Sequence, residues 1–161
     1  LHSSKLPLFS HYQIENQSEE LLNREVNIPS GGKLCIDKTE ALTACDVNSA
    51  RSTKGSDIEA TALATNLEAA QALSEQIRLR DIGGIIAVDF IDMVNKANRT
   101  KVEQAFISAT HADLARIKTV PICQVTGCML LIRQKMGSTI YESVTPAQPR
   151  TVASHPGRIL R

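Results

Sequence analysis

The amino-acid sequence predicts an α/β fold with a mixed sheet flanked by helices, and three observations lead to this prediction. Two short apolar stretches, residues 33–37 and 42–48, are separated by a polar turn and are typical of a β-hairpin. An amphipathic helical pattern follows at residues 56–77. A nearly continuous apolar run at 85–91 indicates a central strand covered on both faces. A hairpin followed by alternating helices and strands favours a mixed α/β sheet.

The elements of the first half follow from turn residues and spacing. Residues 7–12 are expected to be extended, residues 14–24 to form a short helix, and residues 30–32 to form a turn. Ser56 and Glu59 fit a capping box at the start of the amphipathic helix. The apolar positions of that helix recur at steps of three and four, at Leu63, Leu67, Ala70, Leu73 and Ile77.

The second half of the chain predicts three further elements. A helix is expected from about residue 98 to 115, and a strand at 117–125, where Pro121 favours the edge of the sheet. The apolar residues 129–135 are expected to form a last short helix.

Length and composition predict one globular domain followed by a tail. The 161 residues are enough for one core, and we expect a domain at 1–145 and a loose basic C-terminal tail at 146–161. The chain starts at Leu1, without an initiator methionine or a signal-peptide core, which favours a fragment of a longer protein. No apolar run approaches the ~20 residues of a membrane span.

Charge and cysteine content limit the functional classes. The net charge of +1 gives no overall electrostatic argument for a nucleic-acid partner, and 3% aromatic residues are few for a protein that binds RNA mainly by base stacking. Cys123 and Cys128 have no second pair that would complete a zinc site, so the signal for a metal or a disulfide is weak. A reducing, cytoplasmic setting fits the four cysteines best.

Two of the apolar runs end on carboxylates. Because alternate residues of a strand share a face, Asp46 and Asn48 are expected to point the same way, and Asp89 ends the second run. If the two strands are neighbours, Asp46 and Asp89 meet and form a site for Mg²⁺, which prefers oxygen ligands. Asn48 would then support the site without adding negative charge. The alternative is structural, because an aspartate at a strand end often caps a turn or a helix.

Several long strings resemble the bacterial ribonuclease E/G family, and in particular ribonuclease E. They are Phe9-Ser10-His11-Tyr12-Gln13-Ile14-Glu15, Pro29-Ser30-Gly31-Gly32, Thr39-Glu40-Ala41-Leu42-Thr43, Thr65-Asn66-Leu67-Glu68-Ala69-Ala70, Arg78-Leu79-Arg80-Asp81-Ile82-Gly83-Gly84 and Asp89-Phe90-Ile91-Asp92-Met93. The resemblance is close from about residue 7 to 93 and thins after that.

The resemblance implies that the domain is the DNase I-like subdomain of the family's catalytic region. The implied activity is that of a Mg²⁺-dependent endoribonuclease, which cleaves single-stranded A/U-rich RNA in RNA processing and mRNA decay and leaves 5′-phosphate products. The metal-binding catalytic aspartates fall on Asp46 and Asp89, and the supporting catalytic asparagine falls on Asn48. An arginine for the RNA 5′-phosphate falls on Arg116, which from its position alone is also interpretable as a basic residue that favours a helix C-terminus.

The resemblance also implies a bacterial cytoplasmic protein whose full-length relatives form homo-oligomers. Inner-membrane association and RNA-degradation complex partners would involve regions of the family that this sequence does not contain. The S1 domain, the 5′-sensor region and the RNase H-like subdomain of the family also have no counterpart in this sequence. The family's Cys-Pro-x-Cys zinc link has no counterpart, so its zinc site is not supported in this sequence.

Other interpretations of the residues stay open. Asp92 is interpretable as a capping acid of the following helix, and Lys54, Arg78 and Arg80 as RNA backbone contacts or as solvated side chains. An alternative function is a non-catalytic RNA-binding or oligomerisation module derived from ribonuclease E. An unrelated small-molecule enzyme has little support, because no phosphate-binding glycine loop or nucleophile motif is present.

Overall fold

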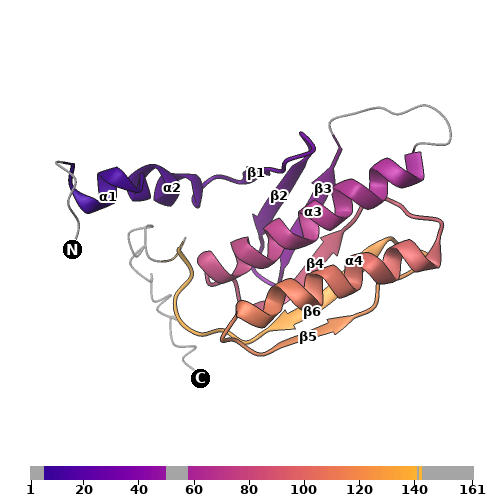
Figure 1. Cartoon of the computed structure of the whole chain (residues 1–161). Helices are drawn as coiled ribbons and strands as arrows, with labels where there is room; N and C mark the ends of the chain where they lie inside the picture. Colours follow the sequence, from indigo (N-terminus) through magenta and orange to yellow (C-terminus); the bar gives the residue numbers. More distant parts are fainter. Residues whose placement is uncertain (1–5, 50–57, 141, 143–161) are drawn as a thin grey trace, which may run out of the picture.

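A six-stranded mixed sheet with two long helices on one face forms the body of the molecule (Figure 1). The computed structural model describes residues 6–49, 58–140 and 142. The strands are β1 (Glu25–Asn27), β2 (Lys33–Lys38), β3 (Thr43–Asn48), β4 (Gly84–Asp89), β5 (Ile117–Val120) and β6 (Cys128–Arg133). The helices are α1 (Leu8–His11), α2 (Ile14–Glu20), α3 (Ile58–Leu79) and α4 (Lys96–Ala109), and α4 continues into the 3₁₀ turn η1 (Thr110–Ala112). The predicted α/β class is confirmed.

The sheet has the strand order β1-β2-β3-β4-β6-β5. β2 and β3 form the predicted antiparallel hairpin. The chain then crosses over through α3 and returns in β4, which is parallel to β3, whereas the other neighbouring strands are antiparallel. Parallel neighbours require such a long crossover, and the crossover brings the C-terminal ends of β3 and β4 to the same edge of the sheet.

The core lies between the sheet and the helices α3 and α4. Its members come from both helices and from the inward-facing positions of the strands, and each large buried side chain contributes roughly 1.5–3 kcal/mol by leaving water. The largest apolar ones are Leu34, Leu73, Ile77, Ile82, Ile86, Val88, Val102, Phe106, Met129 and Leu131. The periodic face predicted for α3 is confirmed, because Ala70, Leu73 and Ile77 are completely buried.

Only one face of the sheet is covered by the described residues, so the prediction of a central strand with two covered faces is wrong. In β4, Ile86 and Val88 are buried, whereas Ile85 is 47% exposed and Asp89 is also exposed. A continuous apolar run does not distinguish a strand that is buried on one face from a strand that is buried on both faces. Leu130 and Ile132 of β6 are exposed beside Ile85 and extend this open face.

Three local predictions are corrected, two of them because the residues pair as strands of the sheet. Residues 8–11 are helical, with the His11 N–H donating to Pro7 O at 2.9 Å, instead of extended. The helix predicted at 14–24 ends at Glu20, because the chain then pairs as β1 with β2. Residues 128–133 form strand β6 between β4 and β5 and not a helix, and their burial alternates from one residue to the next.

The remaining predictions are confirmed in part or lie outside the described residues. β5 is an edge strand, as Pro121 suggested, but it ends at Val120. The predicted helix 98–115 is α4 with η1, and it ends at Ala112. Ser56 and the tail 146–161 lie outside the described residues, so the predicted cap and the boundary of the tail stay predictions. In the described part of the chain, no helix has the length and apolar character needed to cross a membrane.

Candidate metal centre

Asp46 and Asp89 lie opposite each other on the parallel strands β3 and β4. In β3, residues 43, 45 and 47 are buried against the helices, whereas Asp46 and Asn48 are exposed on the open face. Asp89 ends β4 on that same face, because the buried residues Ile86 and Val88 alternate with it. Neighbouring strands lie about 4.8 Å apart, so the structure brings together the two carboxylates that the sequence singled out.

Asn48 is part of the same constellation. Its Nδ2 donates a hydrogen bond to Asp46 Oδ2 at 2.6 Å, which fixes the orientation of that carboxylate. The two residues are two positions apart in β3, so strand geometry alone places both side chains on one face. Asn48 shares the open face with Asp46, as strand parity predicted, and its supporting role in a metal site stays a prediction.

A thiol contacts Asp89 from β6, the strand that neighbours β4 on the side away from β3. Cys128 is the register partner of Asp89 on β6, and its Sγ donates to Asp89 Oδ1 at 3.6 Å. Burial, and then the negative charge of Asp89, raises the pKa of Cys128, which keeps the thiol protonated as a donor. Cys35 is the register partner of Asp46 on β2, so two cysteines flank the acid pair across four strands. The sequence contained no signal for this contact, because it depends on the position of β6.

Asn66 holds the chain that follows Asp89, and sequence reasoning missed this role. It is completely buried on α3; its Nδ2 donates to Ile91 O at 2.8 Å, and its Oδ1 accepts from Ile91 N at 3.0 Å. These two bonds satisfy both backbone groups of Ile91 and fix the direction in which the chain leaves Asp89. A signal was present in the sequence, since an asparagine interrupts the apolar side of α3.

The turn between β5 and β6 approaches the acids closely at Gly127. A Cβ placed on Gly127 would lie 2.9 Å from Asp92 Oδ1 and 3.8 Å from Asp89 Oδ1, and the residue has a φ of 71°. Both facts favour glycine at this position. Asp92 is exposed here and does not cap α4, because Asn95 is the N-cap and its side chain accepts from Ala97 N.

Arg116 lies at the opposite end of the sheet from the acid pair. It directly precedes Ile117, which pairs with Arg133, whereas Asp89 pairs with Cys128 at the other end of β6. About six residues of strand, or roughly 20 Å, separate the two ends. Arg116 is exposed but does not contact the Asp46–Asp89 site.

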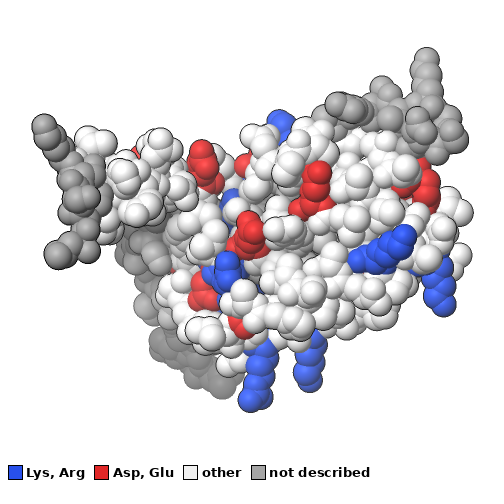
Figure 2. All heavy atoms as spheres, in the orientation of Figure 1, with Lys and Arg blue, Asp and Glu red and all other residues white. Residues whose placement is uncertain are grey.

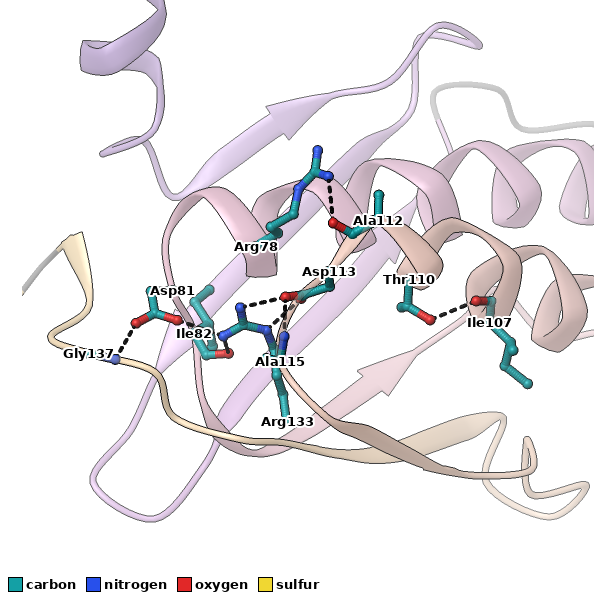
Figure 3. A network of polar contacts seen from close by, with 10 residues as sticks. All are labelled: Arg78, Asp81, Ile82, Ile107, Thr110, Ala112, Asp113, Ala115, Arg133 and Gly137. Atoms are coloured by element: carbon teal, nitrogen blue, oxygen red, sulfur yellow. Dashed lines mark hydrogen bonds and ion pairs between the residues drawn. The ribbon is translucent and has the colours of Figure 1, made fainter.

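A buried ion network positions the segment that carries Arg116 (Figure 3). The guanidinium of Arg133 is bidentate to Asp113, with Nε to Oδ2 at 2.7 Å and Nη2 to Oδ1 at 3.1 Å, and its Nη1 donates to Asp81 Oδ1 at 2.8 Å. Burial alone would raise the pKa of Asp113, but the hydrogen bonds from Arg133 and the Ala115 N–H outweigh it and lower that pKa. Asp81 in turn accepts from Gly137 N at 2.7 Å.

The other basic residues considered from the sequence differ in their exposure. Arg80 is completely buried and donates from Nε to Gln76 Oε1 and from Nη1 to Asn23 O, so a contact with RNA is excluded for it. Arg78 is exposed and donates to Ala112 O at 3.3 Å. Lys54 lies outside the described residues. Acidic and basic side chains are interspersed over the face formed by α3 and α4 (Figure 2).

The donor set at Asp46 and Asp89 fits a hard divalent cation. In the described part of the chain, no group of three or more His, Cys, Asp or Glu residues is placed to hold a metal ion. An ion at this pair would therefore take two carboxylates from the protein and its other ligands from water or a phosphate, which is the usual coordination of Mg²⁺. Such a donor set on an open sheet edge is of the type used by metal-dependent enzymes that act on phosphate esters.

The model of the ribonuclease E/G family matches residues 1–136, and the chain belongs to this family. It is 49% identical to ribonuclease E of Haemophilus influenzae and 49% identical to ribonuclease E of Escherichia coli, in each case over 93% of this chain. It is 42% identical to ribonuclease G of Salmonella typhimurium over 73% of this chain. The matched regions cover 16%, 14% and 24% of these three relatives, so the chain spans only a small part of their length.

Proposed function

We propose that this chain carries the cleavage site of a Mg²⁺-dependent endoribonuclease that acts on single-stranded A/U-rich RNA. The observation that carries the proposal is the position of Asp46 opposite Asp89 on adjacent parallel strands, in a chain of the ribonuclease E/G family. The reaction would leave a 5′-phosphate on the downstream product and serve RNA processing and mRNA decay in the bacterial cytoplasm.

The residues of the site are proposed to have two roles, metal binding and positioning. Asp46 and Asp89 would hold Mg²⁺, which when bound polarises a phosphate oxygen and acidifies a water molecule. Asn48 orients the Asp46 carboxylate by its hydrogen bond, and Asn66 fixes the chain after Asp89 through Ile91. Because both carboxylates are exposed on the open face, an RNA strand has access to them from solvent.

Arg116 is proposed to contact the RNA 5′-phosphate at a second place. Its guanidinium is exposed at the far end of the sheet, and Arg116 O accepts from Gln134 N at 2.9 Å. An exposed arginine on a backbone held in this way is well suited to a phosphate, because its planar donors bind two oxygens at once. One strand of RNA would have to run along the sheet to reach both places.

The partners proposed are single-stranded RNA and, in a longer protein, further copies of the chain and RNA-degradation components. Because the chain covers 16% and 14% of the two ribonuclease E relatives, parts of a longer protein would supply additional RNA contacts. A second candidate is a non-catalytic RNA-binding or oligomerisation module that has kept the fold.

The test is cleavage of a labelled, 5′-monophosphorylated A/U-rich RNA in Mg²⁺ and in EDTA. We expect Mg²⁺-dependent cleavage that Asp89→Asn abolishes and that Glu75→Gln, an exposed carboxylate change on α3, leaves intact. A second measurement is the unfolding temperature, which Mg²⁺ should raise in the unchanged chain but not in Asp89→Asn. A folded chain that shows this Mg²⁺ effect but does not cleave would favour the non-catalytic module.

A further inference from the structure

A hollow lies beside Asp89, between the chain that follows β4 and the turn that joins β5 to β6. It is lined by residues 91–94, by Arg99 of α4, and by residues 122–125 and Gly127 of the turn. Gly127 connects it to the candidate metal centre, because a Cβ placed on Gly127 would lie 2.9 Å from Asp92 Oδ1 and 3.8 Å from Asp89 Oδ1. A ligand in this hollow would therefore be next to the acid pair.

Arg99 is a buried cation without a carboxylate partner. It is 7% exposed, and its Nη1 donates to Met93 O and, at 3.0 Å, to Val94 O. Among the described residues, Arg99 forms no ion pair with a carboxylate, and its Nε and Nη2 are not among the buried donors without a partner, so they are open to solvent. An anion that replaced this solvent would accept charge-assisted hydrogen bonds from them.

Glu59 of α3 interacts with Arg99 through its charge, but its oxygens are hydrogen-bonded to other groups. The carboxylate of Glu59 accepts from Val94 N at 3.0 Å, from Asn95 N at 3.1 Å and from Asn98 Nδ2 at 2.8 Å. These three bonds, and to a smaller extent the charge of Arg99, lower the pKa of Glu59. Glu59 is thus bonded to the start of α4, and Arg99 is the one cationic residue among the described residues that line the hollow.

The other walls of the hollow are mostly apolar. Ile122 is 7% exposed at its base, whereas Val125 is 91% exposed at the tip of the turn. Gln124 contributes an exposed amide, and Asp92 is the one acid among the lining residues. Apolar side chains near a cationic donor suit a nucleotide, whose base is flat and apolar on its faces and whose phosphate is anionic.

We propose that this hollow binds one nucleotide of an RNA strand, with its backbone phosphodiester on Arg99 and its base against Ile122 and Val125. The proposal rests on the function proposed above and extends it, because the occupied nucleotide would be a neighbour of the bond held at Asp46 and Asp89. Asp92 opposes phosphate binding by its charge, so the phosphate belongs on the Arg99 side of the hollow.

The test is RNA binding without metal, measured by fluorescence anisotropy of a labelled single-stranded A/U-rich RNA in EDTA at several salt concentrations. Arg99→Met should weaken binding several-fold and reduce the slope of log affinity against log salt by about 0.7, the value for one lost phosphate contact on a single strand. Gln124→Glu, which adds a charge to the hollow at an exposed position, should also weaken binding. Gln71→Glu, the same change on the exposed side of α3, should not.

Two controls separate this role from a structural one. If Arg99 only held the loop at Met93 and Val94, Arg99→Met would lower the unfolding temperature but leave the salt slope unchanged. Asp92→Asn should tighten binding in EDTA, because it removes the one negative charge of the hollow.

The inference fails if the unchanged chain does not bind this RNA, or if neither Arg99→Met nor Gln124→Glu alters binding. Cleavage that is lost in Asp89→Asn while the Arg99→Met salt slope stays constant would leave the proposed function intact and overturn the inference. If Arg99→Met reduces the salt slope but the unchanged chain does not cleave RNA, the inference stands and the proposed function is overturned.

Discussion

Asp46 and Asp89 are register partners in the parallel strands β3 and β4, and both carboxylates are exposed on the open face of the sheet. The crossover through α3 produces this relationship, because it returns the chain in the same direction. Carboxylate oxygens are the ligands that hard divalent cations prefer, so two of them on adjacent strands are suited to holding such an ion.

Replacing Asn48 should weaken the proposed metal site without affecting the fold. Asn48→Ala removes the 2.6 Å hydrogen bond that orients Asp46, and loss of such a supporting contact typically costs about 10- to 100-fold in metal affinity or activity. Titration with Mn²⁺ and the RNA cleavage rate measure the effect. Asn16→Ala, on the exposed surface of α2, is the matched control. Equal metal affinity in the two variants would contradict a supporting role.

Asn66 should matter for both stability and metal binding. Asn66→Leu leaves the N–H and C=O of Ile91 buried without partners, which should cost about 2–4 kcal/mol of unfolding free energy. The substitution should also displace the residues after Asp89, and the site at Asp46 and Asp89 should then bind metal more weakly. Urea unfolding measures the first effect, and Gln71→Leu on the same helix is the control. An unfolding free energy close to that of the unchanged chain would show that Ile91 finds other partners.

The ion network around Arg133 should make stability depend on pH. Arg133→Met leaves Asp113 and Asp81 without their partner and should cost about 3–5 kcal/mol at neutral pH. The pKa of Asp113 is lowered in the folded state, so its contribution is present above the ordinary value of 3.8 and is lost as the pH falls through the lowered value.

The measurement is the unfolding free energy in urea, at neutral pH and below about pH 4, of the unchanged chain and of Arg133→Met. The unchanged chain should lose more stability on acidification than Arg133→Met, because the variant no longer stabilises the ionised carboxylates. A parallel pH dependence in both chains would show that other groups control acid unfolding.

The alternating burial of β6 predicts losses of unfolding free energy of different size for two adjacent leucines. Leu131 is 1% exposed in the core and Leu130 is 46% exposed on the open face. Leu131→Ala should therefore cost about 2–5 kcal/mol, whereas Leu130→Ala should cost less than about 1 kcal/mol. Thermal and urea unfolding of the two variants make the comparison, and similar losses would be incompatible with the alternating burial of a strand.

Arg116 should affect the recognition of the RNA 5′ end but not the chemistry at the acid pair. Arg116→Gln should slow cleavage of 5′-monophosphorylated RNA while leaving cleavage of 5′-hydroxyl RNA unchanged, because Arg116 lies at the far end of the strands from Asp89. Lys118→Gln, an exposed neighbour on β5, is the control. An equal loss on both RNAs would point to general backbone binding.

Local patterns in the sequence were sufficient for the elements whose burial is periodic. β3 and α3 were predicted because alternation and the three-to-four spacing of apolar residues report directly on a buried face. β2 was also predicted from alternation, although Cys35 is buried together with Leu34 and Ile36. β1 and β6 were missed because β1 has three residues and β6 contains a short apolar run that also fits a helix. Their state is decided by their neighbours in the sheet.

The sequence by itself determined which residue types are present at the ends of β3 and β4, and through parity that Asp46 and Asn48 share a face. Strand geometry alone is enough for that result, since it depends on residues two positions apart. Only the tertiary structure decided that Asp46 faces Asp89, that Cys128 contacts Asp89 and that Asn66 binds Ile91. Those contacts join residues far apart in the chain, and their register is set by packing against the core, which no local pattern encodes.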